Sequence, residues 1–162
     1  MRVAAYINAL PADAARTALV RCCASHQWVN RMLAARPYAS DPELYQVAER
    51  EWWTLDRGDW LEAFAAHPRI GERSTDAWAS GEQSSVTGGA GADFHVALRD
   101  ENDVYERRFG HVYLVCATGL GAAELLADLK TRLANDPDAE LRVAAGEQAK
   151  ITRLRLEKLV TT

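Results

Sequence analysis

Apolar side chains recur along most of the chain at the three- and four-residue spacing of amphipathic helices rather than at every second position. Alanine, leucine, arginine and glutamate, which are strong helix formers, dominate the composition. Both features predict an all-α fold.

Local start and stop signals divide this pattern into separate helices. Ser40-Asp41-Pro42-Glu43 places a capping side chain before a proline and an early acid, which predicts a helix from there to about Leu55. In the same way, Asn135-Asp136-Pro137-Asp138 predicts the start of a last helix that runs to about Leu159. The pattern predicts further helices over residues 11–24, 28–35, 59–65, 94–109 and 122–133, with Gly110 as a left-handed cap.

Two segments do not follow the helical pattern. Residues 73–93 are rich in serine, threonine and glycine, which predicts a loop with one helical turn near Glu82. A loop of this length in a compact domain is often functional, so we expect a lid or a wall of an active site. The apolar run HVYLVCA over residues 111–117 fits either a buried extended segment or a helical turn.

Length and composition narrow the class of protein. With 162 residues the chain is expected to form a single domain over residues 1–162, a helical bundle. Hydrophobic residues at 48% and charged residues at 26% are ordinary for a globular domain. A net charge of −4 offers no basic surface for nucleic acid, and no apolar run reaches the roughly 18 residues that a membrane span needs. Neither nucleic acid nor a membrane is therefore an expected partner.

Cysteines and chain ends suggest a compartment. Cys22 and Cys23 are adjacent and Cys116 stands alone, so we expect buried reduced thiols rather than a disulfide framework. The first residues lack a secretory signal, and residues 160–162 lack a Ser-Lys-Leu type peroxisomal address. A cytoplasmic location is expected.

The sequence His67-Pro68-Arg69-Ile70-Gly71-Glu72 is the strongest candidate for chemistry. Proline fixes its own φ and keeps the preceding residue out of the α region, so His67 should lie just past a helix end in a narrow range of orientations. Gly71 permits a turn that returns Glu72 to the same surface. An imidazole with an ordinary pKa of about 6.5 suits proton transfer, whereas a purely structural histidine would only satisfy a local hydrogen bond.

Other chemistries find less support in the sequence. Zinc requires several converging ligands, and no suitably spaced histidine pair is present, so no metal is expected. Arg153 and Arg155 flank Leu154 on the last helix, and one of them should lean toward the core, but the pattern does not choose between them. A hydrolase with His67 as base and Glu72 or Glu82 as its partner is one alternative. A helical interaction module in which His67-Pro68 merely ends a helix is another.

Four elements together resemble a known family. They are HPRIGE at residues 67–72, Glu82-Gln83 after Trp78, Asn102-x-x-Tyr105-x-x-x-Phe109-Gly110, and KITRLRL at residues 150–156. In this order they resemble 2-oxo-4-hydroxy-4-carboxy-5-ureidoimidazoline (OHCU) decarboxylase over about residues 8–159. A His-Pro-x-Ile-Gly sequence alone is only moderately specific, and the four elements in order make the resemblance strong.

The resemblance implies an all-α, homodimeric enzyme of urate breakdown that needs no cofactor and converts OHCU to (S)-allantoin and CO₂. It places the catalytic residues at His67 and Glu82, and the substrate-binding residues at Pro68, Tyr113, Leu114, Val115 and Arg155. Loss of CO₂ leaves an electron pair on a carbon between imine and carbonyl groups, so the substrate is its own electron sink. No thiamine, pyridoxal or metal is then required.

Overall fold

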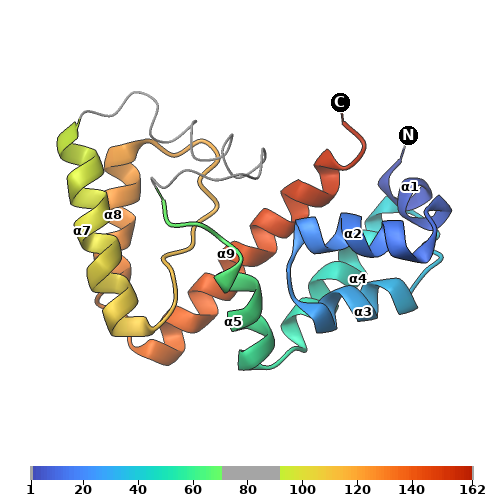
Figure 1. Ribbon diagram of the computed structural model, residues 1–162, viewed down its shortest axis with the longest axis horizontal. Coiled ribbons are helices and arrows are strands. Elements are labelled where there is room, and N and C mark those ends of the chain that lie inside the picture. Colours follow the sequence, from blue (N-terminus) through green and yellow to red (C-terminus); the bar gives the residue numbers. More distant parts are fainter. Residues whose placement is uncertain (1, 71–91, 162) are drawn as a thin grey trace. The chain divides into compact units, whose positions relative to one another are not determined.

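The computed structural model describes residues 2–70 and 92–161, and these residues form eight helices and no strand (Figure 1). The helices are α1 (Val3–Ala9), α2 (Ala12–Cys22), α3 (His26–Ala34), α4 (Asp41–Trp53), α5 (Arg57–Ala65), α7 (Ala92–Phe109), α8 (Ala122–Arg132) and α9 (Pro137–Lys158). The prediction of an all-α fold is confirmed. The predicted loop with Glu82 falls almost entirely on residues 71–91, which lie outside the described part.

Local capping accounts for the helices that the sequence predicts best. The Ser40 hydroxyl accepts a hydrogen bond from the backbone N–H of Glu43 at 3.2 Å, at the start of α4. Asp136 Oδ1 accepts from the backbone N–H groups of Asp138 and Ala139, both at 3.0 Å, at the start of α9. Gly110 follows α7 with a φ of 81°, the left-handed conformation expected there. These caps confirm the helix ends read from the sequence.

Helix α1 was not predicted, because nothing local marks its ends. Its N-cap residue makes no side-chain hydrogen bond and its first turn has no acid. Instead, Asp41 Oδ1 accepts from the backbone N–H of Ala4 at 2.8 Å, and Arg36 Nη1 donates to the carbonyls of Ile7 and Leu10 at 2.9 and 2.8 Å. One backbone N–H at the start of α1 and two carbonyls at its end are therefore satisfied by residues distant in sequence.

The chain divides into two compact units, of which unit 1 comprises Met1–Ala63 and Gln148–Thr162. Within unit 1, α3 packs against both α2 and α4, and α1 packs against α4. Trp28 is fully buried, and its indole N–H donates to the carbonyl of Ala48 on α4 at 3.0 Å. Trp60 donates in the same way to the carbonyl of Trp52 at 3.0 Å. Both large side chains thus satisfy their one polar atom inside the core.

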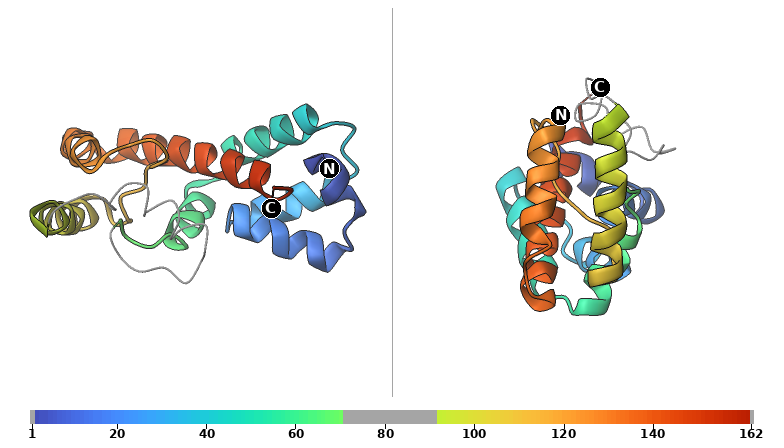
Figure 2. Two further views of the ribbon diagram at one scale, coloured as in Figure 1. Left: turned by 90° about the horizontal axis from the view of Figure 1, so that it is seen from above. Right: turned by 90° about the vertical axis from the view of Figure 1, so that its left-hand side faces the viewer.

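Unit 2 comprises Phe64–Glu147 and contains α7 and α8, which lie side by side (Figures 1 and 2). The motif residues Asn102, Tyr105 and Phe109 are all buried, at the i, i+3 and i+7 positions of one face of α7. The spacing of these residues in the sequence therefore corresponds to the face of α7 that packs into the core. The prediction of one domain for the whole chain stays a prediction.

No helix in the described ranges 2–70 and 92–161 combines the length and the apolar character that a membrane crossing requires.

Candidate active site

His67 lies two residues beyond the end of α5, as the His-Pro sequence predicts. Its backbone N–H donates to the carbonyl of Phe64 at 3.1 Å, so a tight turn connects the end of α5 to this residue. The side chain is partly buried. The imidazole therefore projects from a short segment whose path is set by the helix before it and the proline after it.

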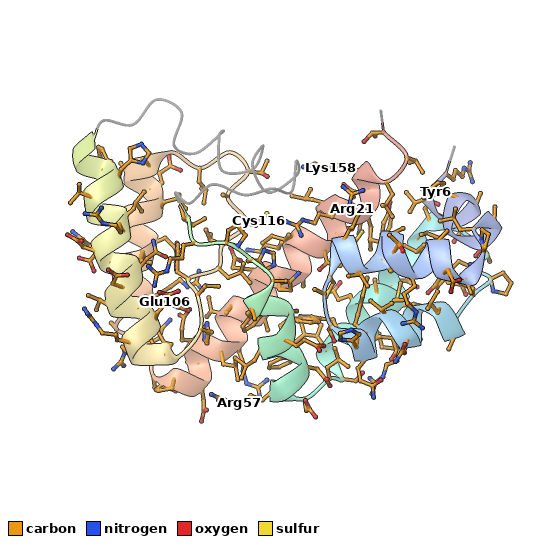
Figure 3. The ribbon with its side chains drawn as sticks, viewed as in Figure 1. Tyr6, Arg21, Arg57, Glu106, Cys116 and Lys158 are labelled. Carbon is orange, nitrogen blue, oxygen red and sulfur yellow. The ribbon has the colours of Figure 1, made fainter. Side chains whose placement is uncertain are left out.

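Arg69 ties this segment to α7. Its Nη1 donates to Asp103 Oδ1 at 2.8 Å and its Nε donates to Glu106 Oε1 at 3.1 Å. Glu106 projects from α7 and is labelled in Figure 3. Because Asp103 and Glu106 are three residues apart, they lie on the same face of the helix and can bond to one guanidinium.

Apolar contacts bring the His67 segment next to residues 111–117. The ring of Phe64, at the end of α5, lies 5.3 Å from the ring of His111. Ile70 packs against a core cluster that includes Tyr113, Val115 and Ala117. Two stretches that are far apart in sequence therefore share one core within unit 2.

Residues 113–115 form neither a helix nor a strand, although they are almost fully buried. The Tyr113 hydroxyl donates to Asp128 Oδ2 on α8. Burial, together with this hydrogen bond, raises the pKa of Tyr113 above its ordinary value. The carbonyl of Leu114 accepts a hydrogen bond from Arg132 Nη1 at 2.7 Å. The sequence allowed HVYLVCA to be either a buried extended segment or a helical turn. In the structure residues 113–115 of this run form a buried irregular segment, and side chains from α8 hold it in place.

Burial distinguishes the two arginines at the end of the chain. Arg155 is 8% exposed, and its Nη1 donates to the carbonyl of Arg21 in the last turn of α2 at 3.2 Å (Arg21 is labelled in Figure 3). The Arg153 side chain is 54% exposed, and it bonds to Glu157 and covers the ring of Tyr45. The inward-leaning arginine of the pair is therefore Arg155.

Cys22 and Cys23 lie in the electrostatic surroundings of Arg155. Burial raises the pKa of each thiol to about 12, although the nearby cation works in the opposite direction. Both are buried and free, as the sequence predicts, whereas Cys116 is only partly buried. The two adjacent thiols have the properties of packing residues.

The predicted site residues fall in both units and partly outside the described residues. His67, Pro68 and residues 113–115 all belong to unit 2, and Arg155 belongs to unit 1. Glu82 lies outside the described residues, as do Gly71 and Glu72. In residues 2–70 and 92–161, no three histidine, cysteine, aspartate or glutamate side chains gather as a metal site would need.

One candidate neighbour of the site was missed by sequence reasoning. His111 lies among aromatic rings, 5.6 Å from Tyr105 and 6.3 Å from Phe109, and its Nδ1 is 3.1 Å from the carbonyl of Val112. No nearby residue in the sequence signals this environment. Only its position at the start of the apolar run HVYLVCA pointed to the same core.

The fold and the site define an all-α protein in which a His-Pro segment is anchored beside a buried irregular segment, without a metal cluster in the described residues. Within that class, the chain belongs to the OHCU decarboxylase family, whose sequence model matches residues 8–157.

Individual relatives agree with this assignment. A uric acid degradation bifunctional protein of Arabidopsis thaliana is 36% identical over 145 residues, which cover 85% of this chain and 45% of that protein. This chain therefore spans less than half of that relative. A 2-oxo-4-hydroxy-4-carboxy-5-ureidoimidazoline decarboxylase of Haloferax volcanii is 27% identical over 132 residues, covering 80% of this chain and 79% of the other.

A solved structure shows the same fold. The crystal structure of an OHCU decarboxylase in the presence of (S)-allantoin superposes with a TM-score of 0.79 at 35% identity, covering 88% of this chain and 96% of that one. A second structure, of an (S)-allantoin synthase, shares the fold with a TM-score of 0.71 at 17% identity, covering 96% of this chain and 53% of that one.

Proposed function

We propose that this chain catalyses the cofactor-independent decarboxylation of OHCU to (S)-allantoin and CO₂ in the breakdown of urate. Membership of the OHCU decarboxylase family over residues 8–157 supports this reaction. So does the likeness to an OHCU decarboxylase solved in the presence of (S)-allantoin. The observation that carries the proposal is the placement of His67, on a segment anchored by Arg69 beside the buried residues 113–115.

The reaction sets clear tasks for the protein. The bond between the hydroxyl-bearing ring carbon and the carboxylate breaks, CO₂ leaves, and the electron pair forms a double bond to the neighbouring imine carbon, whose nitrogen takes up a proton, so that an enol results. A proton must then reach one face of that neighbouring carbon, which carries the ureido group, while the enol hydroxyl loses its proton and becomes the carbonyl of allantoin. The protein therefore has to orient the carboxylate, hold the hydroxyl group and deliver the proton, and no further electron sink is needed.

Each predicted site residue has a role in this scheme. His67 hydrogen-bonds the substrate hydroxyl and takes part in proton transfer, and Glu82 fixes the hydroxyl or the ureido N–H groups. Arg155 binds a ureido or ring carbonyl oxygen, because its planar guanidinium can donate two parallel hydrogen bonds. Pro68 and the backbone of residues 113–115 form walls of the pocket, and apolar walls favour departure of a desolvated carboxylate.

The test is an assay for chiral product. Freshly generated OHCU is incubated with the protein, and circular dichroism follows the accumulation of (S)-allantoin. Protonation in free solution has no preferred face, so only the enzymatic reaction gives a signal. A sample that accelerates loss of OHCU without a circular dichroism signal, or that leaves OHCU unchanged, contradicts the proposed function.

The proposal extends to assembly and compartment. The family resemblance implies a homodimer, and the partly exposed apolar side chains Phe94, Val96 and Val104 on α7 are surfaces that a second copy could cover. The free thiols of Cys22 and Cys23 fit a reducing, cytoplasmic location. Light scattering coupled to size-exclusion chromatography measures the first point, and a purely monomeric protein would contradict it.

A further inference from the structure

A buried ion pair in unit 2 lies next to residues 113–115. Arg132 is the last residue of α8 and Glu140 lies in the first turn of α9, and their side chains are 5% and 0% exposed. Nε and Nη2 of Arg132 donate to Glu140 Oε2 at 2.8 and 2.6 Å. Asn135 Nδ2 donates to the other carboxylate oxygen at 3.0 Å, and the Tyr105 hydroxyl donates to Oε2. The carboxylate is thus satisfied on both oxygens, as a buried charge requires.

Glu140 determines how the guanidinium of Arg132 is oriented. Burial alone would lower the pKa of Arg132, but the hydrogen bonds and charge of Glu140 raise it above its ordinary value, so the group stays cationic. The ring of Tyr113 supports the guanidinium from one side, with its centroid 4.7 Å away. With two nitrogens directed to Glu140, Nη1 points to the carbonyl of Leu114, at 2.7 Å.

This hydrogen bond also fixes the direction of the next N–H group. The Leu114 carbonyl and the Val115 N–H belong to one peptide group, which is planar and trans, so they point in opposite directions. Val115 N–H is therefore directed away from Arg132. Val115 is only 6% exposed, yet its N–H and C=O groups form no hydrogen bond within the described part of the chain. Buried backbone N–H groups are rarely left without an acceptor.

The neighbouring N–H group is already occupied. Cys116, labelled in Figure 3, donates its backbone N–H to Glu147 Oε1 on α9 at 3.2 Å. Arg132 therefore holds the backbone at the carbonyl of Leu114, and Glu147 holds it at the N–H of Cys116, two residues later. Between these two attachments, the N–H of Val115 remains available to a ligand.

We propose that Arg132 is a positioning residue, which orients and polarises the Leu114–Val115 peptide so that the N–H of Val115 donates a hydrogen bond to a carbonyl or carboxylate oxygen of the substrate. This role rests on the proposed function, which places residues 113–115 at the pocket. A cation on the carbonyl oxygen draws electron density from the amide nitrogen, so the N–H becomes a stronger donor. Arginine is required because one planar group has to donate hydrogen bonds to the Glu140 carboxylate and to the Leu114 carbonyl at the same time.

The decisive variant is Arg132→Lys, which keeps the charge but cannot donate in three fixed directions. We expect the ¹⁵N amide resonance of Val115 to shift, and KM for OHCU and Kd for (S)-allantoin each to rise about tenfold, the effect of one hydrogen bond. Arg142→Lys, at an exposed arginine on α9, controls for the exchange itself. An Arg132→Lys protein that is folded and keeps both its KM and its Val115 resonance overturns the role.

A second variant separates positioning from stability. Asn135→Ala removes the bond to Glu140 Oε1 without touching the bond between Arg132 and Leu114. We expect Asn135→Ala to lower Tm and to leave KM unchanged. A tenfold rise in KM would show that any loosening of the ion pair weakens substrate binding as much as Arg132→Lys does. That result would overturn the specific role of Arg132.

A measurement on the unaltered protein keeps the proposal testable if Arg132→Lys does not fold. Addition of (S)-allantoin should move the Val115 amide resonance, and saturating allantoin that leaves this resonance in place overturns the role. A wild-type protein that neither converts OHCU nor binds (S)-allantoin overturns the proposed function and this role with it. If the wild-type enzyme is active but its Val115 amide resonance does not move on addition of (S)-allantoin, only the role of Arg132 is overturned.

Discussion

Arg69 restricts the orientation of the segment that carries His67, more than it stabilises the fold. Its side chain is 37% exposed and that of Asp103 is 42% exposed, so their ion pair is screened by water and contributes little free energy. Two bonds to carboxylates one helical turn apart nevertheless leave the guanidinium a single orientation. A catalytic imidazole benefits from this restriction, because misplacement of a reacting group is costly in rate.

His67→Asn should remove most of the decarboxylase activity and leave the fold intact, because Pro68 and Arg69, not the imidazole, set the path of the segment. Losing a positioned acid or base typically lowers kcat by about 10²–10⁴. Steady-state kinetics with circular dichroism detection checks this. His95→Asn, at an exposed histidine of α7, is the matched control and should be silent. A folded His67→Asn enzyme with unchanged kcat would exclude a catalytic His67.

Arg155→Lys should raise KM about tenfold with a smaller change in kcat, because an ammonium group cannot reproduce two parallel hydrogen bonds to a carbonyl oxygen. Arg153→Lys is the matched control two residues away, at an exposed side chain. Kinetics on both variants decides the assignment. If Arg153→Lys is the damaging change and Arg155→Lys is silent, burial has identified the wrong arginine.

Cys22 and Cys23 should resist alkylation in the native protein, whereas Cys116 should react first. With pKa values of about 12, only about one thiol in 10⁴ is ionised at pH 8, and both thiols are buried. Intact-mass spectrometry after iodoacetamide treatment should show one label before unfolding and three in denaturant. Equal labelling rates at all three positions would contradict a packing role for the adjacent pair.

At the scale of elements, prediction from sequence succeeded where a helix carries its own caps. Ser40 and Asp136 bond to backbone N–H groups two or three residues ahead, and such contacts follow from sequence order. Helix α1 could not be found in this way, because Asp41 and Arg36 satisfy its ends from more than 20 residues away. Contacts of that range depend on the complete fold.

Residues 113–117 show the same limit. An apolar run with no turn signal fits several conformations, and the one adopted depends on Asp128, Arg132 and Glu147, which follow later in the chain. The resemblance to a family indicated that Tyr113, Leu114 and Val115 line a pocket. It did not indicate how their backbone is held.

Gly110→Ala should destabilise the protein by about 1 kcal/mol, because a side chain at positive φ is strained even though nothing lies within 4 Å of the added Cβ. Gly58→Ala is the matched control. Gly58 lies in α5 without a positive φ, and its added Cβ would meet Asp56 Oδ1 at an ordinary 3.4 Å, so this change should stabilise by about 0.5–1 kcal/mol. Urea denaturation measures both, and equal effects would contradict the backbone argument.

At the scale of the whole molecule, the sequence predicted the fold class, whereas its assignment of the site residues stays a prediction. Helical periodicity is spread over the whole chain, so errors at single ends do not change the class. The site residues that we propose are scattered in sequence from His67 to Arg155, and composition or spacing alone could not have grouped them. Only the resemblance to OHCU decarboxylase related them to one reaction, and the role of Glu82 stays a prediction.

Dialysis against a strong chelator should leave the decarboxylation rate unchanged, because the substrate itself can accept the electron pair that CO₂ leaves behind. The measurement compares kcat before and after dialysis, with a zinc-dependent enzyme treated in parallel to show that the chelator works. Loss of activity that added zinc, manganese or magnesium restores would contradict a metal-free reaction.

The division of the chain into units has a consequence for its synthesis. Phe64–Glu147 is one continuous stretch and can pack as soon as it has left the ribosome, whereas Met1–Ala63 must wait for Gln148–Thr162. The helices of Met1–Ala63 are therefore made well before their core is complete, because Ile151 and Leu156, 5% and 0% exposed, follow them only after the whole of unit 2. In that interval the nascent chain exposes apolar surface, which makes the helices of Met1–Ala63 candidates for chaperone binding.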